Sequence, residues 1–233
     1  MKIEVSLTPA LYPYRTIDSH HITVAIDLLR ATTAVCAAFQ AGCETVVPLD
    51  SLEALPRYRQ IGYSLAAERG GSKVGDAEYG NSPTEYLRND MSGKRLAYST
   101  TNGTISILCG ADADLTLVGS FANLSVLCDR LKKEGKDTVL LCSGWQNNFC
   151  IEDTLVAGAI IERLGEKATL CGDATEMALD MWRLAKENPF AYCQKASHVH
   201  RLYGLGAEED VKFAFQMDTC PVVPVLKENK LTL

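Results

Sequence analysis

Short hydrophobic runs alternate with helix-like amphipathic runs along nearly the whole of this 233-residue chain. Several hydrophobic runs are continuous rather than alternating, as in residues 138–142, which is typical of strands buried on both faces of a sheet. The amphipathic runs begin at polar cap residues, and some end at glycine, as helices do. This order predicts an α/β fold of three layers, with a largely parallel or mixed sheet between layers of helices.

The individual elements can be placed from the same pattern. We expect strands at residues 2–7, 22–26, 45–49, 64–67, 95–99, 115–118, 138–142, 168–171, 211–216 and 221–226. We expect helices at residues 31–42, 52–60, 103–110, 121–134, 151–164 and 174–187. The last two predicted strands are close together along the chain, which favours an antiparallel hairpin at an edge of the sheet.

No linker, internal repeat or low-complexity run divides the chain, so the sequence predicts one domain over residues 1–233. A chain of this length can bury a full hydrophobic core. Residues 69–93 are its least regular part and are rich in Gly, Asn, Asp and Ser. We interpret them as a functional loop over the sheet.

Composition excludes several classes of protein. A net charge of −6 argues against non-specific nucleic-acid binding. The nine cysteines include no CxxC pair and lie in apolar runs, which indicates reduced, buried thiols rather than structural zinc. The sequence has neither a signal-peptide pattern nor an apolar run long enough to cross a membrane. We therefore expect a cytoplasmic protein with no nucleic-acid or membrane partner, and a homodimer as the default oligomer.

Polar residues follow several of the predicted strands, and the first group begins at Asp27. In an open α/β sheet, ligands bind at the carboxyl ends of the strands. Arg30 could hold two oxygens of a phosphate, and Thr32 and Thr33 could add hydroxyl donors at the start of the next helix. Asp27 would repel that phosphate unless a cation lay between them, which favours it as a Mg²⁺ ligand. The alternative is a salt bridge from Asp27 to Arg30 that only caps the helix.

A second polar group, Thr100-Thr101-Asn102-Gly103-Thr104, joins the predicted strand 95–99 to a predicted helix. Gly103 lets the backbone approach a ligand closely or adopt a positive φ. The surrounding hydroxyls and amide can bind an oxyanion, whereas a plain helix cap needs only one such residue. We therefore expect these five residues to bind substrate.

Two further groups lie between these segments. Glu68 and Arg69 end the predicted strand 64–67 and supply a second carboxylate and a second guanidinium. Asn81 and Ser82 precede a proline and could bind substrate. The alternative for Ser82 is an ordinary helix cap, because Asn-Ser-Pro is a common helix start.

The last candidate group follows the predicted strand 138–142. Ser143 and Gly144 are candidate substrate ligands, and Glu152 and Asp153 are candidate metal ligands. Adjacent carboxylates at a helix N-terminus are also favoured by the helix dipole alone. One of these two carboxylates is therefore expected to have only that structural role.

Other catalytic patterns are absent from the sequence. It has no Walker-type glycine loop, no G-x-S-x-G elbow, no Cys followed five residues later by Arg, and no acidic residue two positions after Asp27. Among the four histidines, His198 and His200 are candidates for a general acid, although a lone histidine is more often structural.

Six of these segments together resemble one known family. DLLRATT, ERGG, GNSP, TTNGT, GSFAN and IEDTLVAGA occur here in that order, and the resemblance to the 2-phosphosulfolactate phosphatase family runs from about residue 3 to 226. It continues around residues 197–202 and 210–211. It implies a Mg²⁺-dependent acid phosphatase that hydrolyses 2-phospho-3-sulfolactate to 3-sulfolactate and inorganic phosphate, a step associated with coenzyme M synthesis. One departure is the bulky segment Trp145-Gln-Asn-Asn148, which bears on substrate fit.

The expected mechanism is metal-assisted phosphoryl transfer to a small anionic phosphate ester. Mg²⁺ would be held by Asp27 with Glu68 or with one of Glu152 and Asp153, while Arg30 and Arg69 would stabilise the transition state. Water is the simplest nucleophile, and covalent attack by Asp27 stays open. The alternatives are a phosphatase for another phosphorylated or sulfonated hydroxy acid, and a non-catalytic small-anion binding protein.

Overall fold

The computed structural model of the protein describes residues 1–18 and 20–233. Its strands are β1 (Lys2–Ser6), β2 (Ile22–Ile26), β3 (Thr45–Leu49), β4 (Ser64–Arg69), β5 (Ser72–Lys73), β6 (Arg95–Ser99), β7 (Leu115–Gly119), β8 (Thr138–Cys142), β9 (Thr169–Cys171), β10 (Val225–Lys227) and β11 (Lys230–Thr232). Its α-helices are α1 (Ala31–Gln40), α2 (Leu55–Gln60), α3 (Pro83–Arg88), α4 (Gly103–Cys109), α5 (Leu124–Glu134), α6 (Ile151–Leu164), α7 (Asp173–Ala185), α8 (Pro189–Cys193), α9 (Ser197–Tyr203) and α10 (Glu208–Ala214). Short 3₁₀ turns are η1 (Tyr12–Tyr14), η2 (Gly110–Asp112), η3 (Phe121–Asn123) and η4 (Gly165–Lys167).

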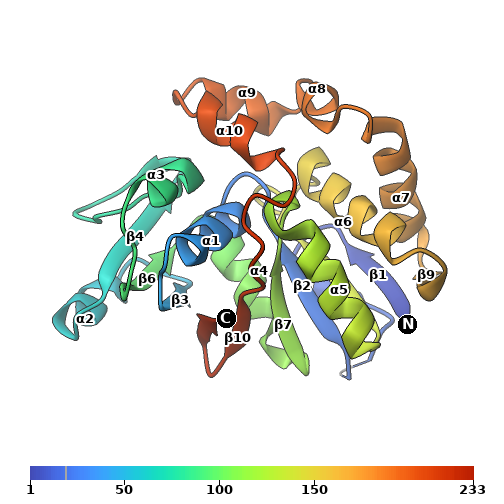
Figure 1. The fold of residues 1–233 in the computed structure, drawn as a ribbon, viewed down its shortest axis with the longest axis horizontal. Helices are drawn as coiled ribbons and strands as arrows, with labels where there is room; N and C mark the ends of the chain where they lie inside the picture. Colours follow the sequence, from blue (N-terminus) through green and yellow to red (C-terminus); the bar gives the residue numbers. More distant parts are fainter. Residues whose placement is uncertain (19) are drawn as a thin grey trace.

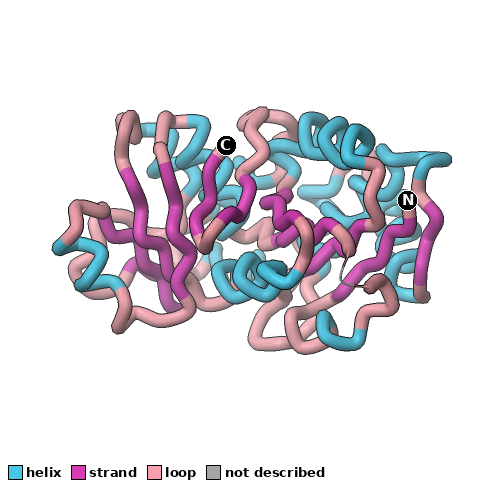
Figure 2. Tube along the Cα trace, turned by 90° about the horizontal axis from the view of Figure 1, so that it is seen from below, coloured by secondary structure: helices cyan, strands magenta, loops and turns pink. Residues whose placement is uncertain are grey.

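The strands form one mixed sheet in the order β5-β4-β6-β3-β11-β10-β7-β2-β8-β1-β9. Strands β4, β6 and β3 make one parallel block, and β7, β2, β8, β1 and β9 make another. The β10–β11 hairpin joins the blocks through three successive antiparallel pairings. Figure 2 shows the strands of the two blocks running at a steep angle to each other. The α/β fold with a mixed sheet that the sequence predicts is confirmed.

Strand β8 shows why the central strands read as continuous hydrophobic runs. All five of its residues are buried. Leu140 and Cys142 pack into the core cluster that also contains side chains of α5, α6 and α7, whereas Val139 and Leu141 pack with Tyr12 on the opposite face. A strand covered on both faces has no solvent-exposed position at which a polar residue is favoured.

Most predicted elements are present at the expected positions. The first eight predicted strands are confirmed, and α6 has the predicted bounds. Ser120 accepts from the backbone N of Ala122, and the Asn123 side chain accepts from the N of Ser120, so the capping group expected before the helix at 121–134 is present. The interval 69–93 is not a single loop, because it contains β5 and α3.

The strand predicted at residues 211–216 is wrong, because these residues belong largely to helix α10. Apolar residues at 211, 213 and 215 alternate as in a strand. However, Val211 and Ala214 are the fully buried pair, at helical spacing, and Glu208, Glu209 and Asp210 form an acidic first turn that suits a helix N-terminus.

The predicted position of the C-terminal hairpin is also wrong. The hairpin is formed by β10 and β11, and it lies inside the sheet between β7 and β3 rather than at an edge. Its two-residue turn is Glu228-Asn229, and both residues have positive φ (48° and 62°), as a type I′ turn requires. The structural reason for the central position is that this hairpin supplies the pairing edges that β3 and β7 would otherwise lack.

Helices α8, α9 and α10, which were not predicted, follow α7 and lie across one end of the structure. Figure 1 shows α9 and α10 at the top, above α1 and beside α3. Helix α10 contacts α3 and α9. This segment brings residues from the last quarter of the sequence to the ends of the central strands.

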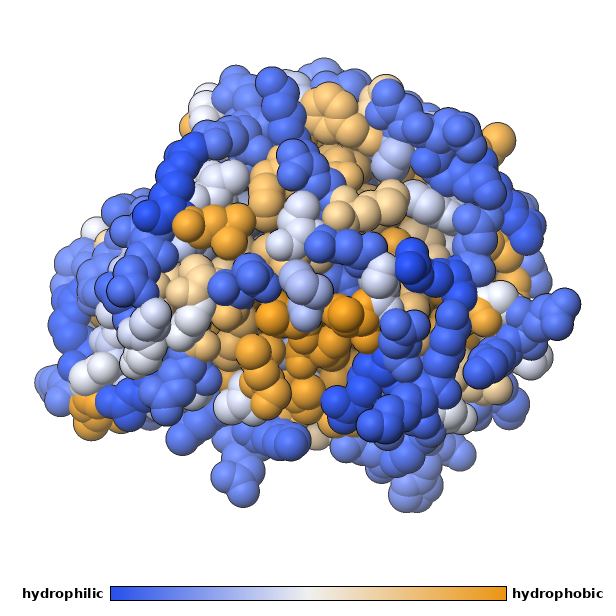
Figure 3. Space-filling view, viewed as in Figure 1, coloured by the Kyte–Doolittle hydropathy of each residue, from blue (hydrophilic) through white to orange (hydrophobic). Residues whose placement is uncertain are grey.

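Hydrophobic residues are unevenly distributed on the surface. Figure 3 shows a face that is largely hydrophilic, with hydrophobic residues gathered near its lower centre. Among the residues that the structure describes, no helix is both long and apolar enough to span a bilayer. The single domain and the homodimer expected from the sequence stay predictions.

Candidate active site

One small, mostly polar pocket lies where the ends of β2, β4, β6 and β8 meet helix α9. Its lining residues are Asp27, Leu29, Arg30, Glu68, Gly71, Asn81, Asn102, Trp145, His198, Arg201 and Leu202. A larger cavity of about 420 Å³ lies elsewhere, between α2, β4 and the loop after β5, and is lined mainly by apolar side chains. We assign the chemistry to the smaller pocket, because it gathers the buried carboxylates, guanidinium groups and imidazole.

Asp27 sits directly after β2, and the loop that follows folds back onto it. Its Oδ1 accepts from the backbone N of Ala31 (3.1 Å), and its Oδ2 lies next to Gly103 at the start of α4. A Cβ at Gly103 would overlap that of Ala31 and lie 2.7 Å from Asp27 Oδ2. Glycine at this position therefore allows the start of α4 to approach the carboxylate closely.

Burial raises the pKa of Asp27 to about 6, and the neighbouring charges modify it. His198 lowers this pKa, whereas Glu68 and Glu152 raise it. Three carboxylates thus influence one another in a buried space. A cation among them would offset this repulsion.

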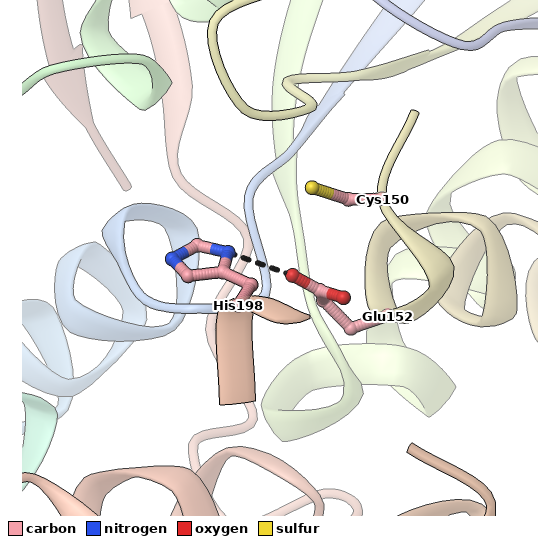
Figure 4. Close-up of side chains that lie close together, drawn as sticks. All are labelled: Cys150, Glu152 and His198. Atoms are coloured by element: carbon pink, nitrogen blue, oxygen red, sulfur yellow. Dashed lines mark hydrogen bonds and ion pairs between the residues drawn. The ribbon is translucent and has the colours of Figure 1, made fainter. Parts of the chain in front are cut away.

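Glu152 lies in the first turn of helix α6 and pairs with His198 from α9, as Figure 4 shows. Its Oε1 lies 2.8 Å from Nδ1 of His198. Arg201 donates from Nη2 to Nε2 of His198 (2.5 Å), and because arginine can only donate, the His198 proton is assigned to Nδ1. The Glu152 carboxylate is therefore held by the His198 ring, which is itself fixed by a guanidinium.

The other Glu152 oxygen tests whether the site fits a metal ion. Glu152 Oε2 is buried and has no hydrogen-bond partner among the described residues. Cys150, Glu152 and His198 each have a possible ligand atom within 4.8 Å of the others (Figure 4). Burial raises the pKa of the Cys150 thiol well above its usual range, and both His198 nitrogens are engaged. The donors best suited to a cation are therefore carboxylate oxygens, which fit a hard ion such as Mg²⁺.

Asp153, beside Glu152, has a different environment. Its Oδ1 accepts from the backbone N of Leu28 (2.8 Å) and its Oδ2 from that of Gly144 (3.0 Å). Burial raises its pKa well above the usual value, and the charges of Asp27 and Glu152 raise it further. Asp153 therefore ties the loop after β2 to the loop after β8, with both oxygens in use.

Glu68 organises the two glycines that follow it. Its carboxylate accepts from the backbone N of Gly71 and from the hydroxyl (3.0 Å) and backbone N (3.2 Å) of Thr101. Gly70 and Gly71 both have positive φ (62° and 91°), a backbone conformation that glycine adopts readily.

The carbonyls of this glycine turn hold two arginines that are far apart in the sequence. The Gly71 oxygen accepts from Arg30 Nη2 (2.6 Å), and the Gly70 oxygen accepts from Arg201 Nη1 (2.8 Å). The Glu68-Arg69-Gly70-Gly71 segment thus joins its own carboxylate and the guanidinium groups of Arg30 and Arg201 through hydrogen bonds.

Residues 7–229 match the model of the family described as 2-phosphosulpholactate phosphatase. The chain belongs to this family. Relatives named "Probable 2-phosphosulfolactate phosphatase" include one from Gloeothece citriformis, 37% identical over 98% of this chain and 97% of the relative. Another, from Thermotoga maritima, is 34% identical over 87% of this chain and 88% of the relative.

The resemblance on which the sequence analysis relied is confirmed by this membership, but the comparisons do not assign roles to single residues. Of the predicted site residues, Asp27, Arg30, Glu68, Asn81 and Asn102 line the pocket. The Asn81 side-chain oxygen accepts from Tyr98 inside the structure. The structure gives the positions of these residues, and their functional roles stay predictions.

Several predicted hydroxyl donors bond within the protein instead of facing the pocket. Thr32 donates to the backbone oxygen of Asp27 (2.9 Å) and Thr33 to that of Leu28 (2.9 Å). Thr104 and Thr100 bond to each other's backbone and hydroxyl groups. Ser143 bonds to Ser106 (2.7 Å).

Two other predicted residues also have local partners. Arg69 donates to the backbone oxygen of Glu68 (2.6 Å) and to the Ser99 hydroxyl (2.9 Å), and it is not among the pocket-lining residues. Ser82 caps α3 by accepting from the N of Glu85 (3.1 Å), which is the alternative that the sequence left open. Of the two candidate histidines, His198 is in the pocket and His200 is exposed.

Three site residues were not predicted as such: Trp145, Arg201 and Asp210. Asp210 accepts from Arg30, Ser82 and Thr84 within 2.7 Å. Arg201 and Asp210 had one signal in the sequence, which was the continuation of the family resemblance around residues 197–202 and 210–211. Trp145 belongs to the bulky segment that was expected to bear on substrate fit. No local pattern indicates that Arg201 and Asp210 return to the strand ends.

Proposed function

We propose that this chain is a Mg²⁺-dependent phosphatase that hydrolyses 2-phospho-3-sulfolactate to 3-sulfolactate and inorganic phosphate. Family membership makes it a phosphoric monoester hydrolase, and its curated relatives carry the name of this activity. The observation that carries the metal dependence is Glu152 Oε2, a buried carboxylate oxygen without a partner among the described residues. The charge of Glu152 also raises the pKa of Asp27.

In the proposal, Glu152 and Asp27 hold the cation. A bound Mg²⁺ offsets the charge of the phosphate and polarises the phosphoryl group. Glu68, whose oxygens accept from Thr101 and Gly71, acts on the site mainly by fixing the glycine turn. Asp153 fixes the two strand-end loops in the same manner.

Arg30 supplies the charge that stabilises the transition state. Its guanidinium is buried, and it is oriented by Asp210 (2.7 Å) and by the Gly71 carbonyl (2.6 Å). A preoriented guanidinium does not have to reorganise as charge develops on the phosphoryl oxygens. The Asp27 carboxylate positions a water for in-line attack, and covalent attack by Asp27 is the competing route. Denaturing quench of a single turnover followed by mass spectrometry separates the two, because only the covalent route attaches a phosphoryl group to Asp27 before water releases it.

The test of the activity is phosphate release from a panel of esters, with Mg²⁺ and with excess EDTA. The panel contains 2-phospho-3-sulfolactate, other phosphorylated hydroxy acids and phenyl phosphate. The proposal expects the highest kcat/KM on phosphosulfolactate and loss of turnover in EDTA that Mg²⁺ restores. Faster turnover of another hydroxy-acid ester would identify a different substrate. Ligand binding without phosphate release from any ester would identify an anion-binding protein. The cytoplasmic location and the link to coenzyme M synthesis stay predictions.

A further inference from the structure

Arg201 lies in the pocket with only part of its hydrogen-bonding capacity used. The guanidinium carries five N–H donors. One is directed to the Gly70 oxygen and one to His198 Nε2, and neither partner is a carboxylate. Nε is buried and has no partner within the part of the chain that the structure describes.

The position of this guanidinium is nevertheless fixed on several sides. Its central carbon lies 3.8 Å from the centroid of the Trp145 ring, which covers one face. The Gly70 carbonyl and the His198 ring hold its edges. The side chain of Leu205 and an Nη of Arg201 lie so close to Gly71 that no Cβ fits there. A guanidinium held in this manner is prepared for a ligand, because little of its side-chain freedom remains to be lost on binding.

Its charge is also not compensated by a direct ion pair. Arg30 is paired with Asp210, and both side chains are 7% exposed. Over residues 1–18 and 20–233, no carboxylate lies within 4.0 Å of the Arg201 guanidinium nitrogens. Arg201 and Arg30 face the same pocket, so the second guanidinium adds positive charge where an anionic ester enters.

We propose that Arg201, stacked on Trp145, is a specificity-determining residue that binds the acidic group of the substrate other than the phosphoryl group. This inference rests on the proposed function, and it defines the substrate class as phosphate esters with a second strongly acidic group, a sulfonate or carboxylate. The metal-binding carboxylates and Arg30 come from the strand ends, whereas Arg201 comes from α9 on the other side of the pocket. The bulky Trp145 segment, which departs from the turn expected for the family, is the surface on which this guanidinium rests.

The test compares Arg201→Gln with wild type on two esters, phosphosulfolactate and phenyl phosphate, which has no second acidic group. We expect Arg201→Gln to raise KM for phosphosulfolactate about tenfold or more, as loss of a charge-assisted hydrogen bond does, with little change for phenyl phosphate. The KM of Arg201→Lys for phosphosulfolactate should lie between those of wild type and Arg201→Gln, because lysine keeps the charge but loses the planar fork. An equal rise in KM for both esters would overturn the proposal, since it would mean that Arg201 acts on the phosphoryl group or only on the fold.

The matched control is Arg183→Gln on α7, whose side chain is 57% exposed. It should leave both esters unaffected. Calorimetry with 3-sulfolactate and with inorganic phosphate, in the presence of Mg²⁺, distinguishes failure of the proposed function from failure of the Arg201 proposal. Even without turnover, Arg201→Gln should weaken 3-sulfolactate binding and leave phosphate binding unchanged. Absence of 3-sulfolactate binding to the wild type, or equal weakening of both ligands, contradicts the proposal.

Discussion

Arg30 and Asp210 are separated by 180 positions in the sequence and form a buried ion pair, with 2.7 Å between Nη1 and Oδ2. The same carboxylate accepts from the hydroxyls of Ser82 and Thr84. This contact joins α10 to the loop after β2 and to the start of α3. It is the point at which the C-terminal helices determine the position of an active-site arginine.

The Asp210→Asn variant tests this contact. Removing one partner of a buried pair leaves the other charge uncompensated, so we expect the free energy of unfolding to fall by about 3–5 kcal/mol. Because Arg30 loses its orienting partner, kcat should fall as well. Chemical denaturation and phosphate release on the same samples check both effects.

The control is the neighbouring Glu209→Gln. Glu209 pairs with Arg88, and both side chains are 63% exposed, so the stability change should stay below about 1 kcal/mol. If Asp210→Asn changes stability no more than Glu209→Gln does, the Arg30–Asp210 pair does not have the structural role assigned to it.

The pH dependence of stability follows from Asp27. Its folded-state pKa of about 6 lies above its ordinary value of 3.8, so the folded protein binds more protons than the unfolded chain between these pH values. The stability due to protonated Asp27 is therefore present at low pH and lost as pH rises through about 6. In EDTA, Asp27→Asn should be more stable than wild type by up to about 3 kcal/mol at neutral pH, and by little near pH 4.

Denaturation curves at several pH values measure this difference. Asp180→Asn is the control, because Asp180 on α7 is 73% exposed. An Asp27→Asn variant whose stability relative to wild type does not depend on pH would show that Asp27 is not protonated in the folded state as described.

Gly103 is a second sensitive position, because the start of α4 has no room for a methyl group beside Asp27 and Ala31. Gly103→Ala forces the helix start or the carboxylate to move. Overpacking of this kind lowers the free energy of unfolding by about 1–3 kcal/mol. Because Asp27 is displaced, kcat should fall as well. Gly204→Ala is the control, since φ there is −61° and the nearest atom to a new Cβ is 3.4 Å away. Equal turnover in the two variants would contradict this role of Gly103.

The cysteines should differ in reactivity according to burial. Seven of the nine are buried, and only Cys109 and Cys171 are partly exposed. Burial raises the pKa of Cys43 to about 11 and of Cys128 to about 12, and the thiolate is the reactive form. A thiol reagent followed by mass spectrometry should label Cys171 and Cys109 in the native protein and the others only after unfolding. Rapid labelling of Cys43 or Cys128 in the native state would contradict the structure.

Much of the fold could be predicted because its signals are local. Continuous apolar strands such as β8 and the cap at Ser120 depend on a few adjacent residues. Helix α10 was mistaken for a strand because Val211, Phe213 and Phe215 alternate. The deciding information is which of these positions meets the core, and that is set by distant residues.

From the sequence, the site could be predicted only as a group of polar residues at the carboxyl ends of the strands. The positions of Asp27 and Glu68 follow from parallel strands, but the partners of individual atoms do not. The hydroxyls of Thr32 and Thr104 suggested a phosphate cradle, whereas in the structure they bond to the backbone. Arg201 was not predicted, because the carbonyl that holds it belongs to Gly70, 131 positions earlier.

In the proposed function, the pocket around Asp27 hydrolyses a phosphate ester with the help of a metal ion. The most direct measurement is phosphate release from 2-phospho-3-sulfolactate by wild type and by folded Asp27→Asn, each with Mg²⁺ and with EDTA. We expect Mg²⁺-dependent release by the wild type and a loss of about 10²–10³ in kcat for Asp27→Asn, by analogy with removal of a single electrostatic stabiliser. Near-normal Mg²⁺-dependent turnover by a folded Asp27→Asn variant would contradict the account.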